Sequence, residues 1–275
     1  MNNSRRGFTL IELSVSLSVI GVLLAITVPA IECVRESART VQCKVHLHEI
    51  GLAIHNFESQ NLMLPAGCDV AGGNRHSWCT RLLPYWDQGA IYRNYDWTRA
   101  WNDSDGTVNH TNKDLTSRTV SVFLCPSEPN ERQGGTDYGG NYGTTLSGMS
   151  PSFDIGGGWE AGALVVINTQ GSQPRYIPTR WGEFTDGLSQ TSLVYECTGL
   201  TTEAGNWGNG FNCLAIDYPI NSDLNGHTIK SSHAAGGGHV LFADGHVKFL
   251  TNGIDVDLLA RLATRNRNEA VESEL

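Results

Sequence analysis

The chain has little charge, and its basic residues are few and scattered. Charged residues make up 17% of the 275 residues, only four of the nineteen basic residues are lysine, and the formal net charge is −9. A general nucleic-acid binder needs clustered cations that displace counterions from phosphate, so this class is excluded. Apolar residues make up 40% of the chain, which is enough for a packed domain.

Patterns that identify common catalytic centres are missing as well. The sequence has no G-x-S-x-G nucleophile elbow, no HExxH pair and no C-x-x-C pair, so no serine hydrolase, no simple zinc or redox motif and no cofactor is predicted. His227, His233, His239 and His246 do gather near Asp244, and imidazole with carboxylate is a common ligand set for zinc. Their glycine-rich spacing places no two of them on one face. A metal-dependent hydrolase is therefore the weaker alternative.

The amino terminus carries a long apolar run. Phe8 to Ile31 spans 24 residues with one formal charge, Glu12, and a helix of that length rises roughly 36 Å, enough to cross a hydrocarbon core of about 30 Å. Arg5 and Arg6 precede the run and the charges after it cancel, which predicts a cytoplasmic amino terminus and an external body.

Three plainer interpretations of this run compete: a cleaved secretory signal, a twin-arginine signal and an ordinary single-span anchor. Glu12 argues against all three. A carboxylate inside lipid costs several kcal/mol and needs a partner or a purpose.

Residues 5–13, Arg-Arg-Gly-Phe-Thr-Leu-Ile-Glu-Leu, resemble the signal of type IV prepilins and pseudopilins. The resemblance implies cleavage after Gly7 by prepilin peptidase and N-methylation of the new terminal residue, Phe8. It also implies that Glu12 meets the amino terminus of a neighbouring pilin-like subunit, so that both charges have partners in the membrane. Pro29 stands where such helices commonly carry a proline, which can kink the helix.

Helical spacing continues beyond Pro29. Two apolar stripes follow one another on rotated faces: Ile31, Val34, Ala38, Val41 and Val45, then Cys43, Leu47, Ile50, Ile54 and Phe57. They predict one helix over residues 8–58, roughly 75 Å long, or a membrane helix followed by a separate amphipathic one. Gly51 weakens the helix by about 1 kcal/mol and marks the expected place for an earlier end.

Spaced blocks in the rest of the chain resemble the prepilin-like family called domain of unknown function 1559, with its carboxy-terminal H-X9-DG signature. The blocks include residues 41–43, 49–57, 64–67, 77–78, 82–85, 123–127 and 185–187, the last leading to Glu196. The signature departs by one residue, because ten residues separate His233 from Asp244-Gly245. Cys43 and Cys125 both lie in blocks typical of this family, so the resemblance implies that they form a disulfide between the helix and the head.

The seven cysteines favour an oxidising compartment with two or three disulfides and one leftover thiol; buried unpaired thiols are the alternative. Cys33 and Cys43 cannot pair, because ten residues separate them by about 15 Å along a helix. The local pairs Cys68 with Cys79 and Cys197 with Cys213 are expected.

Two Asp-Gly pairs predict turns before they predict sites. Asp244-Gly245 joins two apolar runs as a two-residue hairpin over residues 239–250, with Phe242 opposite Val247. Asp186-Gly187 leads into a strand over 192–197, and further strands are expected over 118–124 and 162–167. Residues 255–267 predict a short closing helix.

Two binding surfaces remain as alternatives. Seven tryptophans could line a glycan-binding face, although core packing is the more common role of tryptophan. Asn102, Asp103, Asp105 and Gly106 form an oxygen-rich loop that could hold calcium, but no bidentate glutamate follows at the EF-hand position.

Together these patterns predict an α+β, pilin-like protein that is structural rather than an enzyme. A leader (1–7) precedes a long helix (8–58, with 8–31 in the membrane) and a mostly antiparallel β head (59–275). We expect an inner-membrane protein with a periplasmic head, assembled in a filament or a secretion-related structure, or displayed at the cell surface. The alternative is a membrane-anchored surface module that binds glycan or calcium.

Overall fold

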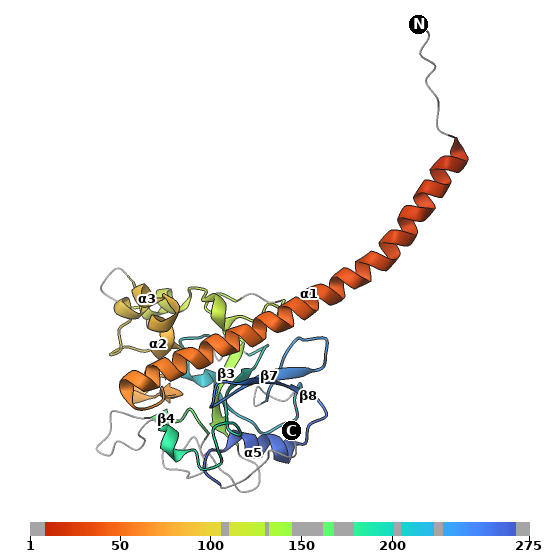
Figure 1. Ribbon diagram of the computed structural model, residues 1–275. Helices are drawn as coiled ribbons and strands as arrows, with labels where there is room; N and C mark the ends of the chain where they lie inside the picture. The colour runs from red at the N-terminus through yellow and green to blue at the C-terminus, as the bar shows by residue number, and fades with distance from the viewer. Residues whose placement is uncertain are drawn as a thin grey trace.

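The computed structural model describes residues 9–105, 110–129, 132–144, 162–167, 179–200, 205–222 and 228–267. One long helix projects from a head that contains all the strands (Figure 1). The predicted leader 1–7, including Gly7, and the adjoining Phe8 lie outside the described residues. This is the α+β, pilin-like arrangement expected from the sequence.

The helix α1 is continuous from Leu10 to Asn61, so the single-helix interpretation is confirmed. Thr9 caps its first turn, and Leu62 ends it in the left-handed conformation with φ 58°. Pro29 lies inside α1 without ending it, and the projecting half of α1 is curved (Figure 1). A proline removes one backbone hydrogen bond, which a long helix can tolerate as a bend.

The two apolar stripes of α1 have different surroundings. Cys43, Leu47, Ile50 and Ile54 are buried against the head, whereas the stripe from Ile31 to Val45 is exposed. Gly51 does not end the helix, contrary to the expectation. A Cβ at this position would lie 3.0 Å from Cδ1 of Leu241, so glycine allows α1 to approach strand β7 closely.

Two sheets and several short helices form the head. The larger sheet has the order β6-β3-β5-β7-β8, in which only β3 and β6 are parallel, and the smaller has the order β2-β1-β4. The strands are β1 Cys68–Asp69, β2 His76–Ser77, β3 Tyr138–Gly143, β4 Val166–Ile167, β5 Ser192–Glu196, β6 Cys213–Ala215, β7 Gly237–Phe242 and β8 Val247–Thr251. The other α-helices are α2 Trp78–Leu82, α3 Gly89–Asn94, α4 Asn112–Thr116 and α5 Val256–Ala263. The 3-10 turns are η1 Ala71–Gly73, η2 Leu83–Trp86, η3 Ser121–Phe123, η5 Trp181–Glu183 and η6 Gly210–Asn212.

Alternating side chains place the larger sheet between α1 and α5. Val194 and Leu241 belong to the core that includes Leu47, Ile50 and Ile54 of α1. Their neighbours along the strands, Tyr195, Val240 and Phe242, belong to a second core with three leucines of α5: Leu258, Leu259 and Leu262. Period-two alternation therefore fixes both faces of the sheet.

The carboxy-terminal hairpin forms, but its register differs from the predicted one. Leu241 pairs with Val247, and the amide of Gly245 donates to the carbonyl of Phe242 at 2.9 Å, with φ +91° at Gly245. The prediction of Phe242 opposite Val247 was therefore wrong by one residue. The loop has three residues and ends in a glycine with positive φ, the geometry of a type I turn with a bulge.

Two further expectations need correction. Residues 118–124 contain the 3-10 turn η3 rather than a strand, and the closing helix is shorter than expected, with Asp255 capping α5 at Val256–Ala263. The tryptophans among the described residues all pack in or against the core: Trp78, Trp86, Trp97, Trp101, Trp181 and Trp207. Trp159 lies outside the described residues.

We expect Leu47→Ala to destabilise the head by about 2–5 kcal/mol, because Leu47 is fully buried between α1 and the head. Val45→Ala is the matched control on the same helix. Val45 is 46% exposed, and its truncation should change stability by roughly 0.5 kcal/mol or less. Guanidinium unfolding of the full chain in mild detergent, followed by tryptophan fluorescence, measures both. Equal effects of the two substitutions would show that α1 is not docked as described.

Candidate functional site

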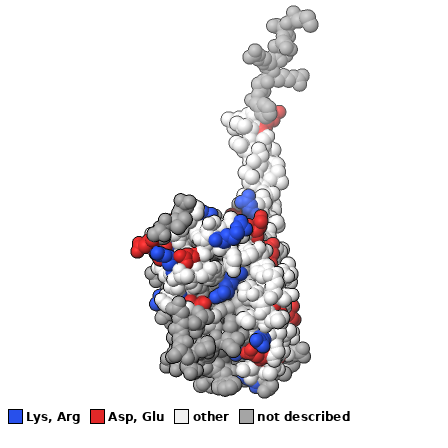
Figure 2. All heavy atoms as spheres, turned by 90° about the vertical axis from the view of Figure 1, so that its left-hand side faces the viewer, with Lys and Arg blue, Asp and Glu red and all other residues white. Residues whose placement is uncertain are grey.

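The first half of α1 is an apolar surface with no cover from the head. Among the described residues, α1 is the one helix long and apolar enough to cross a membrane, and its most apolar window has no buried residue. No charged residue occurs between Glu12 and Glu32. The projecting part of α1 is correspondingly almost free of charged atoms in Figure 2.

Glu12 and Thr9 close the free end of α1 with a reciprocal capping box. The amide of Glu12 donates to Oγ1 of Thr9 at 3.2 Å, and the amide and hydroxyl of Thr9 both donate to Oε2 of Glu12 at 2.9 Å. The carboxylate therefore satisfies one backbone donor within its own chain. Its other oxygen, Oε1, is not used by these bonds.

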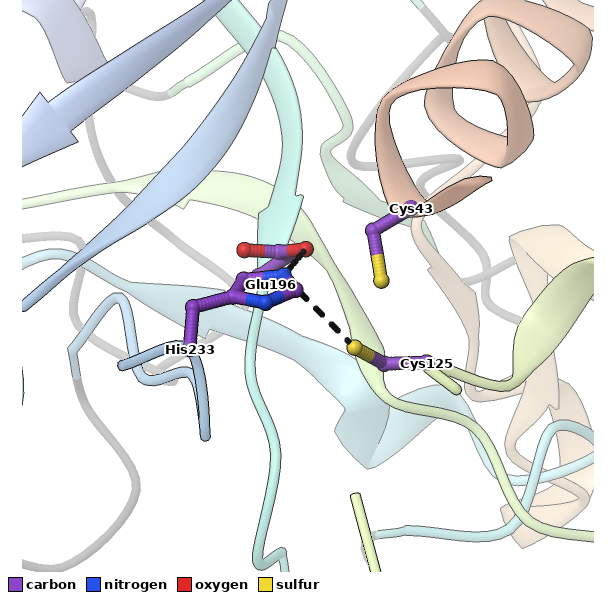
Figure 3. Close-up of side chains that lie close together, drawn as sticks. All are labelled: Cys43, Cys125, Glu196 and His233. Carbon is purple, nitrogen blue, oxygen red and sulfur yellow. Dashed lines mark hydrogen bonds and ion pairs between the residues drawn. The ribbon is translucent and has the colours of Figure 1, made fainter. Parts of the chain in front are cut away.

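A second group of chemically active side chains lies where α1 meets the head. Cys43 comes from α1, Cys125 from the segment after η3, Glu196 from the end of β5, and His233 from the loop before β7. All four residues are buried, and one ligand atom from each lies within 4.8 Å of the other three. Figure 3 shows the two sulfurs, the imidazole and the carboxylate pointing toward one another.

His233 is the centre of this cluster. Its Nε2 lies 3.1 Å from Oε1 of Glu196 and 3.8 Å from Sγ of Cys125. Its Nδ1 lies 3.0 Å from Oε1 of Glu36, two turns before Cys43 on α1. Each ring nitrogen of His233 therefore faces a carboxylate.

Three other residues orient these carboxylates. The backbone amide of His239 donates to Oε2 of Glu196 at 2.8 Å, and its Nδ1 lies 3.1 Å from Oε1 of Glu196. Ser127 donates to Glu36 at 3.0 Å, and Arg39 pairs with Glu36 at 2.7 Å.

The electrostatics of the cluster favour positive charge at its centre. Burial lowers the pKa of His233, but the hydrogen bonds that its ring makes to Cys125, Glu196 and Glu36 outweigh burial and raise the pKa to about 11. Burial raises the pKa of Glu196, but the two histidines outweigh it and lower the pKa to about 2. A hydrogen bond between the sulfurs lowers the pKa of the Cys125 thiol to about 6 and raises that of Cys43.

Comparison with known protein families matches most of the chain. Residues 33–217 match a family described as a protein of unknown function (DUF1559), and residues 2–28 match the prokaryotic N-terminal methylation motif. The chain belongs to the DUF1559 family. Its N-terminal methylation motif indicates a type IV pilin-like protein. Such a protein is processed by prepilin peptidase and anchored in a membrane. Both resemblances inferred from the sequence are confirmed.

No curated protein and no solved structure matches this DUF1559 chain. The matched range includes Cys43, Cys125 and Glu196 but ends before His233. The cluster therefore joins the matched region to the carboxy-terminal segment.

In the structure of this DUF1559 chain, the seven cysteines are free thiols. The sulfurs of Cys43 and Cys125 are adjacent, and their pairing stays a prediction. Cys213 donates to the carbonyl of Leu164 at 3.0 Å, and Cys197 to that of Thr228 at 3.5 Å. Cys68 and Cys79 are buried in the head. The predicted pairs Cys68 with Cys79 and Cys197 with Cys213 likewise stay predictions.

The Asp-Gly pairs serve turns, as their spacing suggested. Oδ1 of Asp244 accepts the amide and Nδ1 of His246 at 3.0 and 2.6 Å on an exposed loop. Oδ2 of Asp186 accepts the amide of Arg267 at 3.0 Å, and Gly187 has φ +101°. The predicted grouping of four histidines around Asp244 is not what the structure has. Among the residues it describes, His246 bonds Asp244 whereas His233 and His239 bond Glu196; His227 lies outside the described residues.

In the loop considered for calcium, both oxygens of the Asp103 carboxylate already have partners. Oδ2 of Asp103 pairs with Arg99 at 2.8 Å, and Oδ1 accepts the amide of Asp105 at 2.7 Å. Asn102 is exposed, and Gly106 lies outside the described residues.

Sequence reasoning missed two members of the cluster. Glu36 was read only as one of several charges after the membrane segment, and Glu196 only as the end of a family block. The available signal was the spacing of Glu36 and Cys43, seven residues apart and thus on one face of a helix.

Proposed function

We propose that this DUF1559 protein is a subunit of a pilin-like assembly. It is cleaved after Gly7, methylated on Phe8 and stored in the inner membrane through residues 8–31, with its head on the periplasmic side. It then joins other pilin-like subunits through α1, in a filament or a secretion-related structure. The observation that carries this proposal is the exposed first half of α1, which has no charged residue between Glu12 and Glu32 and continues without a break into a second half that packs one face against the head.

This surface needs an apolar partner. Large apolar side chains from Leu10 to Val34 are more than half exposed. Contact between so much apolar surface and water is unfavourable. Two surroundings can cover it in turn: lipid before assembly, and the same segment of neighbouring subunits after it. Because α1 is one continuous helix, the position of its membrane segment also fixes the position of the head.

Glu12 supports assembly rather than simple anchoring. An anchor gains nothing from a carboxylate in lipid. After cleavage the new ammonium of Phe8 lies four residues before Glu12 in the sequence, and Thr9 already bonds Oε2 of Glu12. We infer that Glu12, whose Oε1 is not used by the capping bonds, pairs with the amino terminus of an adjoining subunit, as in related pilins.

The mature terminus tests the proposal directly. We expect intact mass and terminal sequencing of the chain from its native host to give N-methylated Phe8. Gly7→Val should leave the leader attached in essentially all molecules, because the peptidase cuts after this glycine. Gly21→Ala is the matched control and should be processed normally, since a Cβ at Gly21 meets no atom within 4 Å. A mature chain that begins at Ile31 would instead establish secretion by an ordinary signal peptide.

A further inference from the structure

We propose that Cys43, Cys125, His233 and Glu196 form a transition-metal site, best suited to zinc, that fastens α1 to the head. The donors are two sulfurs, one imidazole nitrogen and one carboxylate oxygen, a set that zinc binds in proteins. Their ligand atoms lie within 4.8 Å of one another. This inference does not depend on whether the chain assembles.

The distances suit a four-coordinate ion. Ligand atoms around tetrahedral zinc lie roughly 3–4 Å apart, given Zn–S bonds of about 2.3 Å and Zn–N bonds of about 2.0 Å. Nε2 of His233 lies 3.8 Å from Sγ of Cys125 and 3.1 Å from Oε1 of Glu196. Small adjustments of buried side chains are therefore enough to place all four around one ion.

The surroundings of the ligands are those of a metal site as well. A metal-bound histidine commonly donates its second ring N–H to a carboxylate, which fixes its orientation. Nδ1 of His233 lies 3.0 Å from Oε1 of Glu36, and this leaves Nε2 to face the sulfurs. Glu196 is held in turn by the amide of His239 at 2.8 Å.

The Cys43–Cys125 disulfide predicted from the sequence is the alternative to this site, because the same two sulfurs cannot both form a disulfide and bind zinc as thiolates. Zinc would neutralise the thiolates and the carboxylate together, which are otherwise costly to bury.

Metal binding at this site would have a mechanical consequence. Cys125 also lines a cavity of about 530 Å³, together with Gln42, His46 and Asp137. The four ligands come from four separate segments of the chain, so one ion would join α1, β5 and two loops. This link requires both cysteines to stay reduced, whereas a disulfide requires their oxidation.

Metal titration of the full chain in mild detergent tests the inference. After reduction and removal of metal by a chelator, we expect one equivalent of zinc to bind per chain. Cobalt should give the sulfur-to-metal charge-transfer and d–d absorption of a tetrahedral site with two thiolates. Bound zinc should also protect Cys43 and Cys125 from alkylation in a peptide map, a measurement that needs no variant.

Matched variants locate the ligands. Cys125→Ser and His233→Ala should lose the equivalent of zinc, whereas Cys33→Ser and His246→Ala, both at exposed positions, should retain it. Glu36→Ala should weaken zinc binding by about 10-fold to 100-fold, since it orients His233 without touching the ion. Far-ultraviolet circular dichroism verifies that each variant is folded.

Three results would overturn the inference. They are the lack of stoichiometric zinc in the reduced wild-type chain, undiminished binding by a folded Cys125→Ser variant, and a Cys43–Cys125 disulfide in protein from the native host. None of them bears on the mature terminus at Phe8, so failure of this inference is distinguishable from failure of the proposed function.

Discussion

Glu12→Gln should abolish assembly while leaving the chain processed, inserted and folded. Glutamine keeps the size of glutamate and its capacity to cap the first turn, because its carbonyl oxygen can accept from Thr9 as Oε2 of Glu12 does now. What it removes is the negative charge. An unpaired ammonium on Phe8 in lipid costs several kcal/mol, and assembly would be disfavoured by this amount for every subunit added. We expect loss of surface material by at least tenfold, measured by shearing and immunoblotting.

A second substitution separates charge from capping. Thr9→Ala removes the side-chain half of the capping box, about 1 kcal/mol of helix stability, and leaves the carboxylate ionised. Its assembly should stay near the wild-type level. If Glu12→Gln assembled normally while Thr9→Ala failed, Glu12 would be a helix cap and not a partner for the neighbouring amino terminus.

The parts that could be predicted from the sequence are those encoded by local spacing. The apolar run before Glu32, the motif around Glu12 and the buried stripe from Cys43 to Ile54 each depend on neighbours within a few helical turns. The structure has Glu12, the apolar run from Leu10 and the buried stripe in α1, and residues 5–8 of the motif lie outside the described residues. Gly51 was misjudged because its reason is not local: it makes room for Leu241, 190 residues later in the sequence.

Non-local pairing explains the errors in the head. A two-residue turn at Asp244-Gly245 is favoured when only the hairpin is considered. The amide of Ala243 instead donates to the carbonyl of Thr191 at 2.8 Å, and that of Asp244 to Leu188 at 3.2 Å. These contacts with the segment before β5 hold Ala243 in the loop, and the register shifts by one residue.

The buried cluster could be predicted only in part, for the same reason. Sequence reasoning placed Cys43 beside Cys125 because both occur in family blocks, and it noticed that histidines are dense near His233. It could not join the two observations, because Glu196 and His233 reach the sulfurs only after β5 and β7 pair as neighbours in the sheet. The histidines also separate: His246 remains on an exposed loop with Asp244.

Asn141→Asp should unfold the head or destabilise it by about 3–5 kcal/mol at neutral pH, the largest effect expected of an isosteric change in this chain. The side-chain amide of Asn141 in β3 is fully buried. Its nitrogen donates to the carbonyls of Ser192 in β5, at 2.7 Å, and Ala263 in α5, at 2.9 Å. Aspartate has no N–H groups, so it would direct a buried negative charge at two carbonyl oxygens.

Asn94→Asp is the control for this substitution, because Asn94 is exposed and its side chain donates to the carbonyl of Ala90 within its own helix. Its effect should be roughly 0.5 kcal/mol or less. Denaturation midpoints of the full chain in detergent measure both variants. Acidification should partly restore Asn141→Asp, because a protonated carboxyl regains one donor and loses its charge. If this variant were as stable as the wild type at neutral pH, the amide of Asn141 would not be what joins α5 to the sheet, and the second core would depend on its leucines alone.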